Sequence, residues 1–141
     1  MAIYLLDSNI ISEPSKPLPN ENVVSLLEKH RHESVISSIS YFEMLHGVLI
    51  LPEGKRKERL LAYLDETIVP FYDFVQYDFE SSKVNAKIIS KLESVGKPMP
   101  ILDSQIASIA LAHNLILVTR NVKDFSSIQE YFPLQIENWF V

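Results

Sequence analysis

The stretch Ile3-Tyr4-Leu5-Leu6-Asp7-Ser8-Asn9 joins four residues of an apolar run directly to three polar ones. Because polar and apolar residues do not alternate within the run, it is typical of a short strand that is buried on both faces of a sheet. Two similar runs, Val35-Ile36 and Leu115–Val118, follow later in the chain, and helical segments separate them. Strands that alternate with helices in this way predict an α/β fold whose sheet is covered on both faces.

Several segments between these strands have the apolar spacing and the end signals of helices. We expect a helix capped by Asn22, a second that opens at Ser37 to Ser40, and a third with apolar positions from Leu60 to Ile68. We expect Asp78 to cap a long helix that ends before Gly96, and Ile101 to His113 to form the next. The remaining extended segments are predicted at Val69–Val75 and Leu134–Ile136.

Composition limits the possible classes of protein. The chain has 141 residues, of which 47% are hydrophobic, and we see no repeat or linker, so residues 1–141 are predicted to form a single domain. The net charge of −5 argues against a protein that binds polyanions over its whole surface. There are no cysteines, which excludes disulfides and thiol catalysis. No run of residues predicts a signal peptide or a membrane span, so we expect a cytoplasmic protein.

Three acidic residues lie where such a sheet would bring them together. Asp7 ends the first strand, Glu43 is expected in the first turn of the helix after the second strand, and Asp103 opens the helix before the third. Carboxylates gathered at the carboxyl edge of a sheet need a compensating charge, and oxygen ligands alone favour Mg²⁺ or Mn²⁺. Each residue also has a structural explanation: an Asx turn for Asp7, a capping box with Ser40 for Glu43, and a helix cap or a position favoured by the helix dipole for Asp103.

Four stretches of the sequence together resemble the PIN domain, and within it the VapC-type (FitB-like) toxins of bacterial toxin–antitoxin pairs. They occur in the family's order and are Tyr4-Leu5-Leu6-Asp7-Ser8-Asn9-Ile10-Ile11, Ser37-Ser38-Ile39-Ser40-Tyr41-Phe42-Glu43-Met44-Leu45-His46-Gly47, Asp103-Ser104-Gln105-Ile106-Ala107 and Leu117-Val118-Thr119-Arg120-Asn121-Val122-Lys123-Asp124-Phe125. The resemblance covers essentially the whole chain. It implies an α/β/α sandwich with a central, mainly parallel sheet, and a metal-dependent endoribonuclease that acts as a toxin.

The resemblance also implies which residues bind metal. Asp7, Glu43 and Asp103 match the family's acidic catalytic and metal-binding positions. Many relatives carry a further aspartate where this chain has the neutral Asn121, and Asp124 is the nearby residue that could supply the missing charge. The expected cofactor is therefore Mg²⁺ or Mn²⁺, with one or two ions.

Other residues near these motifs are expected to position groups or to bind substrate. Ser8, Asn9 and Thr119 are candidates to orient ligands or water, and Arg120 and Lys123 are candidates to contact RNA phosphates. The remaining basic groups are interpreted as solvated helix faces. They are Lys83, Lys87, Lys91, Lys55-Arg56-Lys57 and Arg59.

The resemblance implies partners as well as a substrate. The substrate would be RNA, and a cognate antitoxin would cover the acidic pocket, while many such toxins form homodimers. The helical hairpin from Ser40 to Ile68 is the predicted docking surface for the antitoxin because it combines apolar and basic faces.

Alternative functions remain beside this interpretation. The strongest is a catalytically degenerate PIN domain that serves as a protein- or RNA-interaction module, which Asn121 favours and the three retained acids oppose. A haloacid-dehalogenase-type phosphatase needs a second aspartate where Asn9 stands. A receiver domain needs an acid directly after Val35-Ile36.

Overall fold

The apolar runs of the sequence form the strands of one parallel sheet. The computed structural model describes residues 1–141 and has five strands in the order β3-β2-β1-β4-β5, every neighbouring pair of which is parallel. The α/β fold with a central parallel sheet is therefore confirmed. The strands are β1 (Tyr4–Leu6), β2 (Ser34–Ser37), β3 (Asp73–Val75), β4 (Ile116–Val118) and β5 (Ile136–Glu137).

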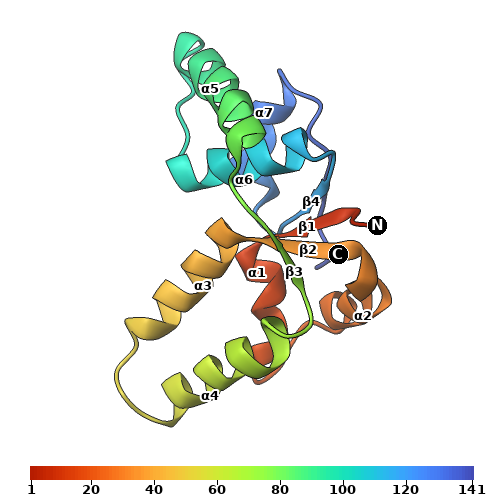
Figure 1. The fold of residues 1–141 in the computed structure, drawn as a ribbon, viewed down its shortest axis with the longest axis vertical. Helices are drawn as coiled ribbons and strands as arrows, with labels where there is room; N and C mark the ends of the chain where they lie inside the picture. Colours follow the sequence, from red (N-terminus) through yellow and green to blue (C-terminus); the bar gives the residue numbers. More distant parts are fainter.

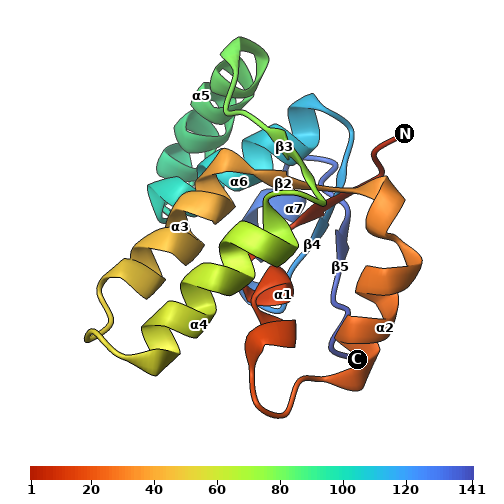
Figure 2. The same ribbon diagram turned by 60° about the horizontal axis from the view of Figure 1, so that its bottom comes forward.

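Helices cover both faces of this sheet (Figure 1). One layer contains α1 (Ser8–Ile11), α2 (Glu21–Lys29), α3 (Ser38–Leu49) and α4 (Lys55–Tyr63), and the other contains α5 (Phe79–Ser94), α6 (Ile101–Ala112) and α7 (Ser126–Gln129). Figure 2 shows α3 and α4 running side by side as a hairpin. None of the helices is both long and apolar enough to cross a membrane. Shorter turns complete the chain: η1 (Glu13–Ser15), η2 (Arg31–Glu33), η3 (Leu64–Ile68) and η4 (Val122–Phe125).

Each face of the sheet has its own hydrophobic core. Leu5 on β1 packs in the core under α5 and α6, whereas its neighbour Leu6 packs in the core under α1 to α4, and both are fully buried. Leu117 and Val118 on β4 divide between the two cores in the same way. Successive side chains of a strand point to opposite faces, so a strand that is covered on both sides must be apolar throughout.

Two helix starts can be compared with their predicted caps. Asp78 caps α5 as expected, because its Oδ1 accepts a hydrogen bond of 2.9 Å from the Ser81 N–H. The prediction that Asn22 caps α2 is wrong. The cap is Asn20, whose Oδ1 accepts from the Val23 N–H at 3.1 Å, while the Asn22 amide donates to the Trp139 carbonyl at 2.8 Å.

The predicted extended segments are longer than, or displaced from, the observed strands. In place of a strand over Val69–Val75, the chain continues α4 through η3, and its backbone turns back on Ile68 before β3 begins at Asp73. Leu64 and Ile68 are buried in η3, so the apolar core favours one more helical turn. Leu134 lies in the other core and precedes β5, which begins at Ile136.

Candidate active site

The carboxyl ends of three neighbouring strands meet at one edge of the sheet. Asp7 follows β1, Ser37 ends β2, and Thr119 follows β4. The Asp7 N–H donates to the Val118 carbonyl at 2.9 Å, which ties the end of β1 to the end of β4. This edge is where ligand sites form in open α/β sheets.

Asp7 is a buried carboxylate held by three hydrogen bonds. Its side chain and backbone are only 6% exposed. The Ser8 N–H donates to Oδ1 at 2.8 Å, and the Thr119 hydroxyl and the Asn9 amide donate to Oδ2 at 2.8 and 3.3 Å. Asp7 also caps α1, so the polar turn expected after the first strand is the start of a short helix. These contacts hold the carboxylate in one orientation.

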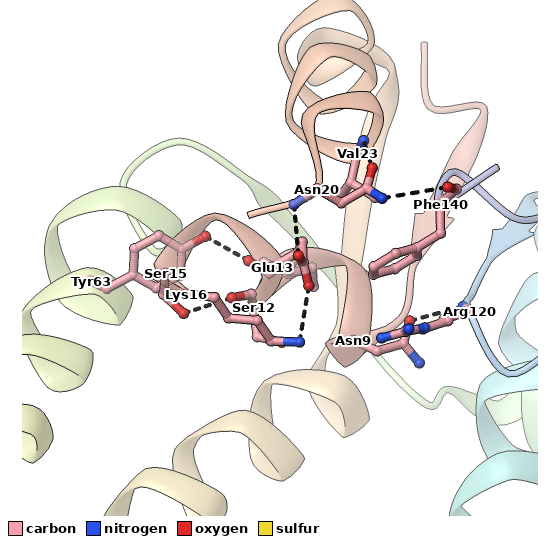
Figure 3. Close-up of polar contacts among 11 residues, drawn as sticks. Asn9, Ser12, Glu13, Ser15, Lys16, Asn20, Val23, Tyr63, Arg120 and Phe140 are labelled. Carbon is pink, nitrogen blue, oxygen red and sulfur yellow. Dashed lines mark hydrogen bonds and ion pairs between the residues drawn. The ribbon is translucent and has the colours of Figure 1, made fainter. Parts of the chain in front are cut away.

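The same network fixes the loop after β4. The Thr119 hydroxyl accepts hydrogen bonds from the Asn121 N–H at 3.1 Å and from the Asn9 amide at 3.4 Å. The Asn9 side-chain oxygen accepts from the Arg120 N–H at 3.0 Å, a contact drawn in Figure 3. Asn9 and Thr119, which the sequence suggests as positioning residues, thus lie against Asp7, whereas Ser8 contacts it through its backbone.

Glu43 lies in the second turn of α3, half-buried, and not in the first turn as expected. The alternative that Glu43 forms a capping box with Ser40 is wrong, because the cap is Ser37, whose hydroxyl accepts from the Ser40 N–H at 3.0 Å. Ser40 is buried inside the helix. Glu43 is therefore free of any capping contact.

Asp103 lies in the first turn of α6, also half-buried. The alternative that it caps this helix is wrong, because Pro100 occupies the cap position and makes no side-chain hydrogen bond. The Asp103 side chain makes no hydrogen bond, but its place in the first turn is one where the helix dipole favours a negative charge, as the other structural explanation expects.

The charges of these residues act on one another. Burial, then the carboxylates of Asp7 and Asp103, raise the pKa of Glu43 to about 7. Burial, Asp7 and Asp124 raise the pKa of Asp103. Burial also raises the pKa of Asp7, against the three hydrogen bonds that lower it. No lysine, arginine or histidine forms an ion pair with Asp7, Glu43 or Asp103.

Asn121 and Asp124 are the two candidates for the fourth metal-binding position. Asp124, exposed on η4, adds its negative charge to those of Asp7 and Asp103, whose pKa values it raises. Asn121 lies on the wall of an adjoining cavity and contacts Thr119 only through its backbone. By charge, Asp124 is the residue that belongs with the other three carboxylates.

This cluster suits a divalent cation in its charge and its donor atoms. Three acidic side chains without a basic partner repel one another, and a cation removes that repulsion. No three carboxylate or imidazole groups are arranged closely enough to hold an ion by themselves. Mg²⁺ commonly takes only one or two carboxylates directly and keeps several waters, so an ion need not contact all three side chains.

A cavity of about 450 Å³ opens beside Glu43, between α3, α4 and the loop after α1. Ser8, Asn9, Glu43 and Asn121 form its end nearest the carboxylates. Its other polar residues are Lys16, Arg56 and Arg59, together with small hydroxyl groups. The interpretation of Arg56 and Arg59 as a solvated helix face missed this placement. Their spacing of three residues on one helix was the signal, because it puts both on the same side.

The basic residues predicted to contact RNA lie outside that cavity. The Arg120 guanidinium packs over the Phe140 ring, 4.5 Å from its centroid, and is exposed. Lys123 is exposed on η4, one residue before Asp124. Lys83, Lys87 and Lys91 are exposed on α5, in the other helical layer, as expected for a solvated face.

The chain is similar to known proteins along almost its whole length. The PIN domain family model matches residues 4–131. Toxin FitB of Neisseria gonorrhoeae is 36% identical over 87% of this chain and 91% of its own, and ribonuclease VapC1 of Haemophilus influenzae is 32% identical over 97% and 98%. The solved structure of FitAB bound to an IR36 DNA fragment matches with a TM-score of 0.87 and 30% identity, over 99% of this chain and 96% of that one.

Proposed function

The chain belongs to the PIN domain family, and from that premise we propose that it is a metal-dependent endoribonuclease that acts as the toxin of a toxin–antitoxin pair. The observation that carries the proposal is the carboxylate cluster of Asp7, Glu43 and Asp103. These residues come from separate parts of the chain and have no basic partner; besides burial, Asp7 raises the pKa of both Glu43 and Asp103, and Asp103 also raises that of Glu43. The similar proteins named as a toxin and as a ribonuclease support the same activity.

In this proposal each residue at the sheet edge has a defined part. Asp7, Glu43 and Asp103 would hold Mg²⁺ or Mn²⁺, with Asp124 adding negative charge. When bound, the ion supplies a water of lowered pKa and charge stabilisation for phosphodiester hydrolysis. Thr119 and Asn9 keep Asp7 in a single orientation through their hydrogen bonds.

Substrate binding requires positive charge near a site that is itself acidic. Arg120 and Lys123 lie in the segment that follows β4, where the Arg120 N–H donates to Asn9 and Lys123 directly precedes Asp124, and both side chains are exposed. We expect them to contact phosphates of an RNA that crosses this edge of the sheet in the cytoplasm.

The partner in this proposal is a cognate antitoxin that docks on the hairpin of α3 and α4. Phe42 is 53% exposed on α3 and stacks on His46, so a large apolar side chain is available there. Leu45 is half-buried and packs against the core, so a substitution there would also disturb the fold. Phe42 is therefore the better position for a substitution that tests the surface. A folded Phe42→Asp variant should lose antitoxin binding in a pull-down, and unchanged binding would dismiss this surface. Sedimentation of the toxin alone tests the expected homodimer.

The second candidate function is a degenerate PIN domain that binds protein or RNA without cleaving it. Asn121 favours this alternative because it replaces an acid with a neutral side chain. The uncompensated charges of Asp7, Glu43 and Asp103 favour the enzyme, since a binding module gains nothing from their repulsion.

Cleavage of total RNA by the purified protein in Mn²⁺, with and without EDTA, separates the two functions. We expect cleavage by the wild type that EDTA abolishes, and no cleavage by an Asp7→Asn variant prepared in parallel. Equal cleavage by the variant would identify a contaminating nuclease. An inactive wild type that still binds RNA or antitoxin would support the interaction module.

A further inference from the structure

The cavity beside Glu43 has two chemically different parts. Its apolar lining comes from the two helices of the hairpin and the loop that joins them, and includes Met44, Val48, Leu51 and Leu60. Its rim carries basic side chains from α4 and from the loop after α1. A volume of about 450 Å³ is within the range of small-ligand sites. Such a cavity suits a ligand that has a flat apolar part and a negative charge.

The basic rim is available to an anion. Neither Arg56 nor Arg59 forms an ion pair with an acidic side chain, although both line the cavity. They lie three residues apart on α4, so both guanidinium groups are on one side of the helix. Guanidinium groups bind phosphate through paired hydrogen bonds.

A third cation is held at the opposite rim. The Lys16 ammonium lies 2.9 Å from Oε1 of Glu13, and the Asn20 N–H donates to Oε2 at 2.8 Å (Figure 3). Glu13 is 4% exposed, and although burial raises the pKa of its carboxyl, the contacts with Asn20 and Lys16 bring it below the usual value. The buried carboxylate thereby fixes the loop, and Lys16 stays at the cavity.

Gly47 leaves the wall of the cavity open. It lies inside α3 and lines the cavity, its backbone has no positive φ, and a Cβ built there meets no atom within 4 Å. Neither backbone conformation nor packing therefore requires a glycine, which costs roughly 1 kcal/mol relative to alanine inside a helix. The missing side chain leaves room at the cavity wall.

We propose that this cavity binds one nucleotide of a single-stranded RNA substrate, adjacent to the bond that is cut. The base lies on the apolar lining against Gly47, and its phosphate is held by Arg56 and Arg59 with Lys16 opposite. Glu43 and Asn9 line the same cavity, so the strand continues from this subsite to the carboxylates without leaving the protein surface. The subsite rests on the proposed ribonuclease function and adds to it a position that recognises the nucleotide itself.

The test is binding of a fluorescein-labelled, single-stranded RNA of about ten nucleotides, a length within the usual site sizes, by fluorescence anisotropy. An Asp7→Asn background keeps the RNA intact. The Gly47→Leu substitution fills the cavity, and Gly47→Ala is its control for helix propensity. The double substitution Arg56→Ala with Arg59→Ala removes two cations, and Lys83→Ala with Lys87→Ala on α5 removes the same charge elsewhere.

We expect Gly47→Leu to weaken RNA binding by about tenfold or more without lowering the melting temperature, and Gly47→Ala to have a much smaller effect. The double arginine variant should lose a similar factor. The slope of log K against log salt should become smaller by about 0.7, because the two arginines together neutralise one phosphate. The double lysine variant should bind almost as the parent does.

Unchanged RNA affinity in Gly47→Leu and in the arginine variant would overturn the proposal. Equal losses in the arginine and lysine variants would also overturn it, because they would show only a general effect of charge. Binding requires no cleavage. If the wild type binds RNA through this cavity but does not cut it, the ribonuclease function is refuted and the subsite stands. If Gly47→Leu cuts RNA as fast as the wild type does, the subsite is refuted and the ribonuclease function stands.

Discussion

Replacing Glu43 by glutamine should stabilise the metal-free protein at neutral and higher pH. Burial of the Glu43 carboxylate, together with the nearby carboxylates of Asp7 and Asp103, raises its pKa from 4.5 to about 7. A shift of this size corresponds to roughly 3.4 kcal/mol at 1.36 kcal/mol per unit. Since Glu43 is only half-buried, solvent screening reduces the usable figure to about 1 to 2 kcal/mol. Glutamine keeps the shape of the side chain and removes this cost.

The pH dependence of the effect has a definite sign. Between pH 4.5 and about 7, folded Glu43 binds more protons than unfolded Glu43, so the free energy of unfolding falls as the pH rises through this window. Above pH 7 the full cost is present, and below pH 4.5 it is absent. The difference in stability between the wild type and Glu43→Gln should follow the same curve.

Thermal unfolding in EDTA, followed by circular dichroism over this pH range, measures the difference. We expect the variant to melt about 3 to 8 °C higher at pH 8 and at the same temperature as the wild type at pH 4. Glu28→Gln, an exposed position on α2, is the control for the change in net charge. A Glu43→Gln protein that is folded but no more stable than the wild type at pH 8 would refute the claim that burial and the neighbouring carboxylates destabilise ionised Glu43 in the folded protein.

Three further substitutions test the framework around the site. Thr119→Val removes the 2.8 Å hydrogen bond to buried Asp7 and should cost about 1 to 3 kcal/mol in chemical denaturation, whereas Thr119→Ser, which keeps the hydroxyl, should retain most of the stability. Leu117→Ala opens a cavity at a fully buried position of the sheet and should cost about 2 to 5 kcal/mol; a loss below 1 kcal/mol would contradict the core described. Asn20→Ala should cost about 1 kcal/mol through loss of the α2 cap, and Ser25→Ala on the same helix should cost almost nothing in the same assay.

The fold could be predicted from the sequence because its strands are buried on both faces. Runs such as Ile3–Leu6 and Leu115–Val118 are apolar throughout, and this pattern predicts a parallel sheet with helices on both faces. The residues at which helices and strands begin and end were less predictable where tertiary contacts determine them. Asn22 has the residue type of a cap, but it contacts the carbonyl of Trp139, far away in the chain, and Asn20 takes its place.

The site was predictable where it depends on residues at strand ends. The order of strands brings Asp7 and Thr119 together because β1 and β4 are neighbours. Arg56 and Arg59 could not be placed in the same way, since their distance from the site depends on how α4 packs against α3. Sequence periodicity shows that they share a helix face, and only the three-dimensional arrangement shows that this face lines the cavity beside Glu43.

The most direct test of the proposed site is the initial rate of cleavage of one RNA at saturating Mn²⁺ by four isosteric variants. Asp7→Asn, Glu43→Gln and Asp103→Asn each remove one charge of the cluster, and Glu28→Gln is the control. Because a metal site contributes several kcal/mol of transition-state stabilisation, we predict that each of the three loses about a hundredfold or more and that the control keeps the wild-type rate. A wild-type rate in any of the three would contradict the assignment of these carboxylates as one catalytic site.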